Sequence, residues 1–403
     1  MSNAQLGIMS CRKGAYITTI GENKADCFYI IRSGSVRVTR EIDIKGESKS
    51  IVLKPGDFFG VVSTMSHHPH IDTAQAIEDT KIITVKKDQF QFLIQNNTAV
   101  AMNIINGFSK RVRVLNKELV RKSGISKQEI GPETLYSSAE VYIKSNRYNE
   151  AYFLYNKYIS ESSNSENIKK AKLRMERLKP YAKSQIALQG DTSFVRHYPK
   201  DCMIFGEGQK GTELYILQKG QVKITKIVEN KEIILAILKA GDMFGEMALL
   251  EDKPRSASAI SYENADLMVI SRSNFKKMVS EQPQIVTKLT ILLADRIWGT
   301  TKLIENANIS DYVGRLYDWL SVELEKMNVP LNTKESAKFN FGIKELINIV
   351  GIPRDKVDES LVELYKNHKI SEKDGKLHSS DVSEIRSQCA YYRKMDRIKK
   401  NRI

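Results

Sequence analysis

The sequence carries one pattern twice, and this duplication is the feature that most limits what the chain can fold into. Residues 58–60 (Phe-Phe-Gly) match residues 243–245 (Met-Phe-Gly), and Pro69 matches Pro254 at the same spacing with no gap between them. Further pairs match at a spacing one residue longer, namely Tyr29 with Tyr215, Ile30 with Ile216 and Gly34 with Gly220. Self-similarity over this distance indicates that a whole domain is duplicated. We therefore expect two copies of one architecture.

Each copy shows the spacing of short strands joined by tight turns. In the first copy, apolar runs at residues 27–31, 36–38 and 51–53 are separated by glycines and by a Pro-Gly-Asp turn. This spacing predicts an antiparallel β-barrel or sandwich. After Val85 the apolar residues adopt helical spacing, and a second long apolar stripe follows Pro283. The predicted fold class is α+β, with two β-barrel (jelly-roll) domains that each end in a long helix.

The segment between the two copies has the spacing of a helical hairpin. Its small and aromatic residues resemble one tetratricopeptide repeat, with the turn at Asn146 and Arg147. A single repeat cannot bury its own apolar face, so we expect it to pack on a neighbouring domain or on a second copy of itself. A helical spacer is the favoured interpretation, and a peptide-binding platform is the alternative.

The C-terminal part of the chain carries a helix-turn-helix pattern followed by a short hairpin. Gly351 marks the turn, Pro353 begins the second helix, and Asp374-Gly375 closes the hairpin. This pattern predicts a winged helix, joined to the rest of the chain by a hinge at residues 306–311. The predicted domains are residues 1–125, 130–183 (the tetratricopeptide-like insert), 187–308 and 309–403 (the winged helix with a basic tail).

One stretch of the second copy has the chemistry of a small-anion site. Gly245 opens a short apolar helix, Glu246 follows it, and Pro254 ends the helix before Arg255 and Ser256. Peptide N–H groups at a helix start favour an anion, and an arginine forks onto phosphate oxygens. An ionised glutamate repels phosphate but accepts a hydrogen bond from a sugar hydroxyl. An anion beside a hydroxyl describes a cyclic nucleotide, whereas an ordinary turn with a surface Glu and Arg is the simpler but less favoured alternative.

This stretch resembles the phosphate-binding cassette of cyclic-nucleotide-binding domains. The chain from about residue 185 to residue 390 resembles the cyclic-AMP receptor (catabolite activator)/FNR-type family of transcription regulators. The resemblance implies that Arg296 pairs with Glu246 and that Thr300 and Thr301 contact the base, although two surface threonines would show the same spacing. It implies cAMP as the effector, with cGMP as the alternative, and no metal. The implied ligand-binding residues are Gly245, Glu246, Met247, Ala248, Arg255, Ser256, Arg296, Thr300 and Thr301.

The first copy lacks the side chains that this chemistry needs. The corresponding residues are Val61 for Glu246, His70 for Arg255, Ile71 for Ser256, and Leu115 and Asn116 for the two threonines, while the helix arginine is kept as Arg111. We therefore predict that the first domain does not bind a cyclic nucleotide in the usual manner.

A local cluster of histidines follows the first copy of the cassette. His67, His68 and His70 are three of the six histidines in the chain, and Asp72 lies beside them. Imidazole and carboxylate are metal ligands, so a metal site is one interpretation. A polar surface loop is the favoured one, because no second cluster of ligands is evident.

The chain's charge points to a polyanionic partner. Its net charge is +15 with a pI of about 9.4, which suits nucleic acid. Arg354 can fork onto guanine, but acids outnumber bases in the second helix, and the basic tail at residues 386–403 would supply phosphate contacts instead. The candidate DNA-binding residues are Arg354, Asp355, Lys356 and Glu359.

These observations predict a ligand-gated, DNA-binding transcription regulator. The alternative is a signalling adaptor or regulatory subunit that binds protein, which the acidic second helix favours. An enzyme is not expected, because the sequence lacks a phosphate-binding Gly-Lys-Ser/Thr loop and any nucleophile set. Scattered cysteines, no signal peptide and no apolar run of roughly 18 residues predict a cytoplasmic protein that does not bind membranes. We expect a homodimer, or a pseudo-dimer formed by the two copies within one chain.

Overall fold

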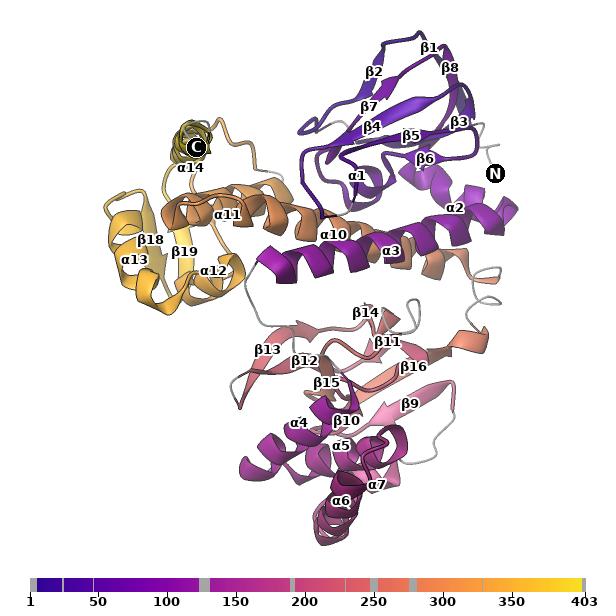
Figure 1. Cartoon of the computed structure of the whole chain (residues 1–403), viewed down its shortest axis with the longest axis vertical. Coiled ribbons are helices and arrows are strands. Elements are labelled where there is room, and N and C mark those ends of the chain that lie inside the picture. The colour runs from indigo at the N-terminus through magenta and orange to yellow at the C-terminus, as the bar shows by residue number, and fades with distance from the viewer. Residues whose placement is uncertain are drawn as a thin grey trace. The chain divides into compact units, whose positions relative to one another are not determined.

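The computed structural model describes residues 6–400, apart from residues 24, 46, 123–130, 189–192, 229, 247–252, 275–280 and 328. The chain forms two compact units (Figure 1). One unit comprises residues 1–126 and 290–403, and the other comprises residues 127–289. Each unit contains one copy of the repeated domain. Among the described helices, none combines the length and the apolar character needed to cross a membrane.

The first copy consists of two antiparallel sheets. One sheet has the order β1-β8-β3-β6 and the other has the order β2-β7-β4-β5. The strands are β1 (Gly7–Cys11), β2 (Tyr16–Thr18), β3 (Cys27–Ser33), β4 (Val36–Arg40), β5 (Ser50–Leu53), β6 (Phe58–Phe59), β7 (Asp72–Ala76) and β8 (Thr80–Lys86). The helices are α1 (Val61–Ser66), α2 (Lys87–Asn96) and α3 (Thr98–Lys122). Alternating side chains of β4, such as Val36 and Val38, are buried between the sheets.

The second copy repeats this topology strand for strand. Its sheets have the orders β9-β16-β11-β14 and β10-β15-β12-β13. The strands are β9 (Val195–Tyr198), β10 (Met203–Phe205), β11 (Glu213–Lys219), β12 (Val222–Val228), β13 (Lys231–Leu238), β14 (Met243–Phe244), β15 (Ser258–Ser261) and β16 (Ala265–Ser271). Helix α10 (Pro283–Ala307) follows it and has the same length of 25 residues as α3. The predicted duplication is therefore confirmed, in the form of paired sheets in each copy.

The repeated residues make the same contacts in both copies. Tyr29 pairs with Phe59 across β3 and β6, and Tyr215 pairs with Phe244 across β11 and β14. The rings of these pairs stack, with centroids 5.0 Å and 5.3 Å apart. Such cross-strand aromatic pairs fix the register of a short strand, which explains why the pattern survives in both copies.

Four helices precede the second copy among the described residues of its unit. They are α4 (Pro132–Lys144), α5 (Tyr148–Glu161), α6 (Ser165–Leu178) and α7 (Lys183–Ala187). Leu154 and Tyr155 of α5 are fully buried in a cluster that includes Met203 of β10 and Ile260 of β15. Arg147 donates a hydrogen bond of 2.6 Å to Glu232 of β13. The hairpin therefore buries its apolar face against the domain that follows it, one of the two possibilities expected from the sequence.

The C-terminal region packs three short strands against helices. Its elements are α11 (Tyr312–Lys326), β17 (Ala337–Lys338), α12 (Ile343–Val350), η1 (Arg354–Lys356), α13 (Val357–Tyr365), β18 (Ile370–Lys373), β19 (Lys376–Ser379) and α14 (Val382–Lys400). Gly351 ends α12 with a φ of 67°. Asp374 and Gly375 both have positive φ between β18 and β19, the geometry of a type I′ hairpin turn.

The basic C-terminal stretch forms a packed helix. Val382 and Ile385 of α14 are fully buried, and Cys389 is nearly so. Arg393 of α14 donates hydrogen bonds of 3.0 Å and 2.6 Å to the buried Asp318 of α11. Asp318 also accepts a hydrogen bond of 3.0 Å from Asn306, near the end of α10. The carboxylate of Asp318 thus links the end of α10 to the middle of α11 and to α14, across residues 306–311, where the sequence predicts a hinge.

Candidate functional site

The start of the predicted cassette adopts a backbone conformation that favours glycine. Gly245 follows β14 with a φ of 77°, in the left-handed region. A Cβ atom at this position would lie 2.7 Å from Nη1 of Arg255 and 3.2 Å from the rings of Phe205 and Tyr215. The backbone therefore approaches Arg255 as closely as a residue without a side chain allows. Met247 and Ala248 lie outside the described residues, as does most of the predicted cassette helix.

Arg255 lies in a buried slot of the second copy. Its exposed fraction is 3%, and its guanidinium lies 4.2 Å from the centroid of the Phe205 ring. Its Nη1 donates to the carbonyl of Gly245, and its Nη2 donates to the carbonyl of Glu213 at 2.6 Å. Its Nε has no hydrogen-bond partner among the described residues. Burial lowers the pKa of Arg255. A phosphate oxygen is a stronger acceptor than these carbonyls, so an anion would stabilise this cation.

The neighbouring carboxylate of Glu213 is held by another cation. Arg196 donates hydrogen bonds of 3.1 Å and 2.8 Å to Glu213, and the Tyr215 hydroxyl donates a third of 2.8 Å. Burial by itself would raise the pKa of Glu213, but the hydrogen bonds from Arg196 and Tyr215 bring it below its usual range. Glu213 is thus committed to Arg196, and it offers Arg255 its carbonyl rather than its carboxylate.

The remaining predicted residues of the cassette differ in exposure. Glu246 is fully buried at the start of the helix, whereas Ser256 is exposed. Sequence reasoning missed Glu213, Arg196 and Phe205, which hold Arg255 in place. No sequence motif identifies these residues. Glu213 contacts Arg255 through its backbone carbonyl, Arg196 forms an ion pair with Glu213, and Phe205 contacts the guanidinium with the face of its ring.

The predicted residues of α10 belong to the unit that contains the first copy. Thr301 is 3% exposed, and with Ile297 it lines a cavity of the first domain. Its hydroxyl has no hydrogen-bond partner among the described residues. Thr300 is half-buried and Arg296 is exposed. The predicted contacts of Arg296, Thr300 and Thr301 with the cassette remain predictions.

The first copy keeps the backbone of the cassette and changes its chemistry. Gly60 has a φ of 78°, almost the value of Gly245, and α1 begins at the next residue. Val61 and His70 are buried at the positions of Glu246 and Arg255. His68 of the histidine cluster stacks on Trp298, with ring centroids 4.1 Å apart. Asp72 lies 3.5 Å from Nε of Arg40.

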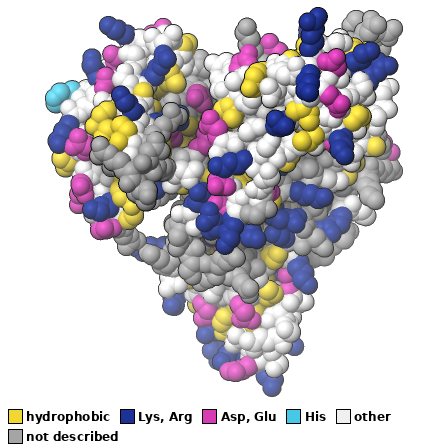
Figure 2. All heavy atoms as spheres, turned by 45° about the horizontal axis from the view of Figure 1, so that its top comes forward, with side chains coloured by type: hydrophobic (Ala, Val, Ile, Leu, Met, Phe, Trp, Pro, Cys, Tyr) yellow, Lys and Arg dark blue, Asp and Glu magenta, His cyan; other side chains and the backbone are white. Residues whose placement is uncertain are grey.

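The predicted DNA-binding residues lie on the surface where they are described. Asp355, Lys356 and Glu359 are exposed, and Lys356 pairs with Glu359 at 3.1 Å. The side chain of Arg354 lies outside the described residues. In the basic tail, Arg393 is committed to Asp318, whereas Arg386 and Lys394 are exposed. Figure 2 shows basic side chains interspersed with acidic ones over the visible face.

Comparisons with known proteins match both copies. The family described as "Cyclic nucleotide-binding domain" matches residues 8–97 and 195–282. The chain is 30% identical over 179 residues to the cAMP-activated global transcriptional regulator CRP of Pasteurella multocida, covering 44% of this chain and 85% of that regulator.

Two solved structures illustrate the wider similarity. The Catabolite Activator Protein of Thermus thermophilus is 24% identical with a TM-score of 0.29, covering 49% of this chain and 90% of that chain. The regulatory domain of Toxoplasma gondii PKA with cAMP is 19% identical with a TM-score of 0.21, covering 70% of this chain and 84% of that chain.

Proposed function

This chain belongs to the CRP/FNR-type family of cyclic-nucleotide-binding regulators, and from that premise we propose that it is a cAMP-gated, DNA-binding transcription regulator. It is a regulator rather than an enzyme. The proposal assigns the effector to the second copy of the domain and the DNA to a winged helix formed by α12, α13 and the hairpin β18–β19. It names cAMP in preference to cGMP.

The buried Arg255 is the observation that carries the proposal. Arg255 is buried and donates to the carbonyl oxygens of Gly245 and Glu213, so its desolvation cost has already been met in the folded protein and an anion gains more from it than from an exposed arginine. We assign the ligand phosphate to Arg255 and Ser256 and the ribose hydroxyl to Glu246. The base contact that the resemblance implies on α10 is assigned to Thr300, since the Thr301 hydroxyl lines the cavity of the first domain.

The assigned contacts suggest how binding reaches the C-terminal region. A ligand that contacts α10 favours one arrangement of that helix over another. Near the end of α10, Asn306 donates hydrogen bonds of 2.8 Å to the Arg315 carbonyl and 3.0 Å to Asp318. A shift of α10 would therefore move α11 and, through Arg393, α14.

Calorimetry with cAMP and with cGMP tests the assignment of the ligand site. Arg255→Ala should weaken cAMP binding by about 1.5–3 kcal/mol, roughly 10- to 150-fold, because a charge-assisted contact is lost. His70→Ala, at the matching position of the first copy, is the control and should leave the affinity unchanged. Equal affinities of the Arg255→Ala and parent chains would overturn the site.

Fluorescence anisotropy with labelled duplex DNA tests the DNA assignment. We expect binding that strengthens at low salt and in the presence of cAMP, and that weakens on Arg354→Ala. Removing the tail would expose the buried face of α14, so its contribution is tested by the double variant Arg386→Gln, Lys394→Gln. That variant should reduce the salt dependence without abolishing binding.

A protein-binding adaptor is the second candidate function. The exposed Asp355 and Glu359 favour it, because acidic side chains approach phosphate poorly. In that case the chain would show no DNA affinity at low salt, with or without cAMP.

Measuring the solution mass with and without cAMP distinguishes a homodimer from a pairing of the two copies within one chain.

A further inference from the structure

The first copy of the domain encloses a cavity of its own. Its volume is about 470 Å³, in the range of sites for small organic ligands. Residues of β4 to β7, α1, α3 and α10 line it, and all of them belong to one compact unit. The cavity lies where the cassette chemistry has been lost, since Val61 and His70 are among its lining residues.

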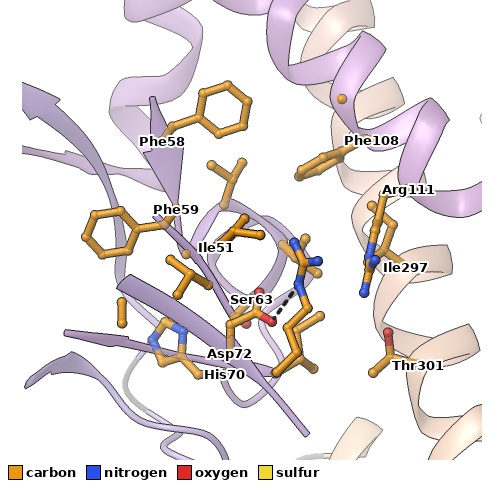
Figure 3. Close-up of a pocket in the computed structure, with 18 of the residues that line it drawn as sticks. Ile51, Phe58, Phe59, Ser63, His70, Asp72, Phe108, Arg111, Ile297 and Thr301 are labelled. Carbon is orange, nitrogen blue, oxygen red and sulfur yellow. Dashed lines mark ion pairs between the residues drawn. The ribbon is translucent and has the colours of Figure 1, made fainter. Parts of the chain in front are cut away.

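The cavity is apolar at one end and polar at the other. Figure 3 shows the rings of Phe58 and Phe108 together at one end, while Asp72 and Thr301 lie toward the other and Arg111 faces the space from the side. Aliphatic side chains make up much of the remaining wall. This arrangement matches an amphipathic ligand whose body is apolar and whose head is charged or polar.

Two arginines at the cavity share acidic partners. Nη1 of Arg111 lies 2.6 Å from Glu47, and Nη1 of Arg40 lies 3.7 Å from the same carboxylate. Arg40 also lies 3.5 Å from Asp72. Burial and the nearby Arg40 lower the pKa of Arg111. Glu47 is exposed, whereas Arg111 is half-buried and lines the cavity, so a carboxylate ligand can replace Glu47 as the partner of Arg111.

A buried hydroxyl without a partner among the described residues indicates that the cavity is built for an occupant. Thr301 lines the cavity and is only 3% exposed. Its hydroxyl has no hydrogen-bond partner among the described residues. An unsatisfied buried hydroxyl costs about 1–3 kcal/mol unless a ligand satisfies it. Gly107 lies inside α3, where glycine costs roughly 1 kcal/mol relative to alanine. A Cβ there would lie 3.9 Å from Phe58, an ordinary contact distance, so only a side chain larger than alanine would fill the aromatic end.

We propose that the first domain is a second effector site, which binds a small amphipathic monocarboxylic acid rather than a cyclic nucleotide. The carboxylate binds Arg111 in place of Glu47, the apolar body lies between Phe58 and Phe108, and a polar atom of the ligand reaches the Thr301 hydroxyl. Val61 and His70 provide neither the ribose acceptor nor the phosphate fork of the second copy. Because Ile297 and Thr301 belong to α10, the acid contacts the helix that leads into the C-terminal region.

The test uses 4-phenylbutyrate as the probe and its uncharged analogue 4-phenyl-1-butanol as the matched comparison. Trp298, next to Ile297 on α10, reports binding by its fluorescence in a full-length Trp319→Phe chain. We expect saturable binding of the acid, at least tenfold weaker in Arg111→Met and severalfold weaker in Thr301→Val. Binding of the alcohol should be weak and unaffected by Arg111→Met. Arg37→Met, an exposed arginine on the same strand as Arg40, should bind the acid like the parent.

Further variants make the outcome decisive. Gly107→Leu should abolish binding of both probes by filling the cavity, while thermal unfolding and circular dichroism confirm that the chain is folded. No saturable binding of 4-phenylbutyrate by the parent, or equal binding by Arg111→Met, would overturn the proposal. In the Arg255→Ala background, displacement of the acid by cAMP would place a nucleotide in this cavity and also overturn it. Failure of cAMP binding to the second copy would leave these results unchanged, so the two proposals are tested separately.

Discussion

The two matching glycines offer a controlled test of the assigned phosphate site. Gly245 and Gly60 have φ values of 77° and 78°, so alanine meets the same backbone strain at both positions. Their surroundings differ. A Cβ at Gly245 would lie 2.7 Å from Nη1 of Arg255, whereas at Gly60 the nearest atom would be 3.6 Å away. Alanine at Gly245 therefore displaces the guanidinium, and alanine at Gly60 displaces nothing.

The expected magnitudes follow from these contacts. A left-handed conformation costs alanine about 1–2 kcal/mol, which is the expected loss of unfolding free energy for Gly60→Ala. Gly245→Ala adds the loss of hydrogen bonds from a charged donor, about 1.5–3 kcal/mol, for a total of roughly 2.5–5 kcal/mol. The same displacement should weaken cAMP binding about 10- to 150-fold, because the guanidinium no longer faces the phosphate.

Urea unfolding and cAMP calorimetry on both variants measure the two effects. Gly60→Ala should lose stability but keep its affinity for cAMP, and Gly245→Ala should lose both. If the two variants bind cAMP equally well, the proposed role of Arg255 is wrong. If they lose the same stability, the close approach of Gly245 to Arg255 does not contribute.

Three further predictions concern other parts of the molecule. Asp318→Asn should lower the unfolding free energy by about 1.5–3 kcal/mol, since Arg393 and Asn306 lose a buried carboxylate; an unchanged urea midpoint would contradict this. Leu154→Ala should cost about 2–5 kcal/mol because Leu154 is fully buried, whereas Leu173→Ala, at a 57% exposed position of α6, should change the urea midpoint little. Burial lowers the pKa of His68 to about 4 from 6.5, so only the unfolded chain is protonated between these values. The contribution of His68 to stability should therefore fall as the pH drops from 6.5 to 4, and urea titrations of His68→Gln against the parent chain should show a stability difference that changes with pH over this range.

The sequence predicted the features that depend on local patterns. The duplication was readable because Tyr29–Phe59 and Tyr215–Phe244 pair across strands, and such pairs constrain residue type at a fixed spacing. The hairpin at Asp374 was readable because its turn requires positive φ at two residues. Gly245 and Arg255 were predicted to belong to one anion site because they occur in a fixed order with Glu246 and Pro254 between them.

The sequence did not predict the features that depend on packing. The partners of Arg255 are carbonyl oxygens, which every residue possesses, so no residue type identifies them. The sequence indicated only that the first copy had lost the cassette side chains. It could not predict the cavity there, because the volume of a cavity depends on how the helices and sheets pack. In α14, the apolar spacing of Val382, Ile385 and Cys389 was the available signal, and the surrounding charges obscured it.

The replacement of the arginine by His70 in the first copy has a consequence for how the proposed regulator responds to its nucleotide. A dimer of single-domain chains has two equivalent phosphate sites, and positive coupling between them makes the binding curve sigmoidal. In the proposed assignment, this chain has two copies of the domain, and the second copy alone carries the phosphate contacts of Arg255 and Ser256. A monomeric chain therefore titrates hyperbolically with a Hill coefficient near 1, spread over about a hundredfold range of nucleotide concentration between 10% and 90% saturation. Such a protein grades its output with nucleotide level instead of switching at a threshold, and a steeper curve would report self-association of the chain.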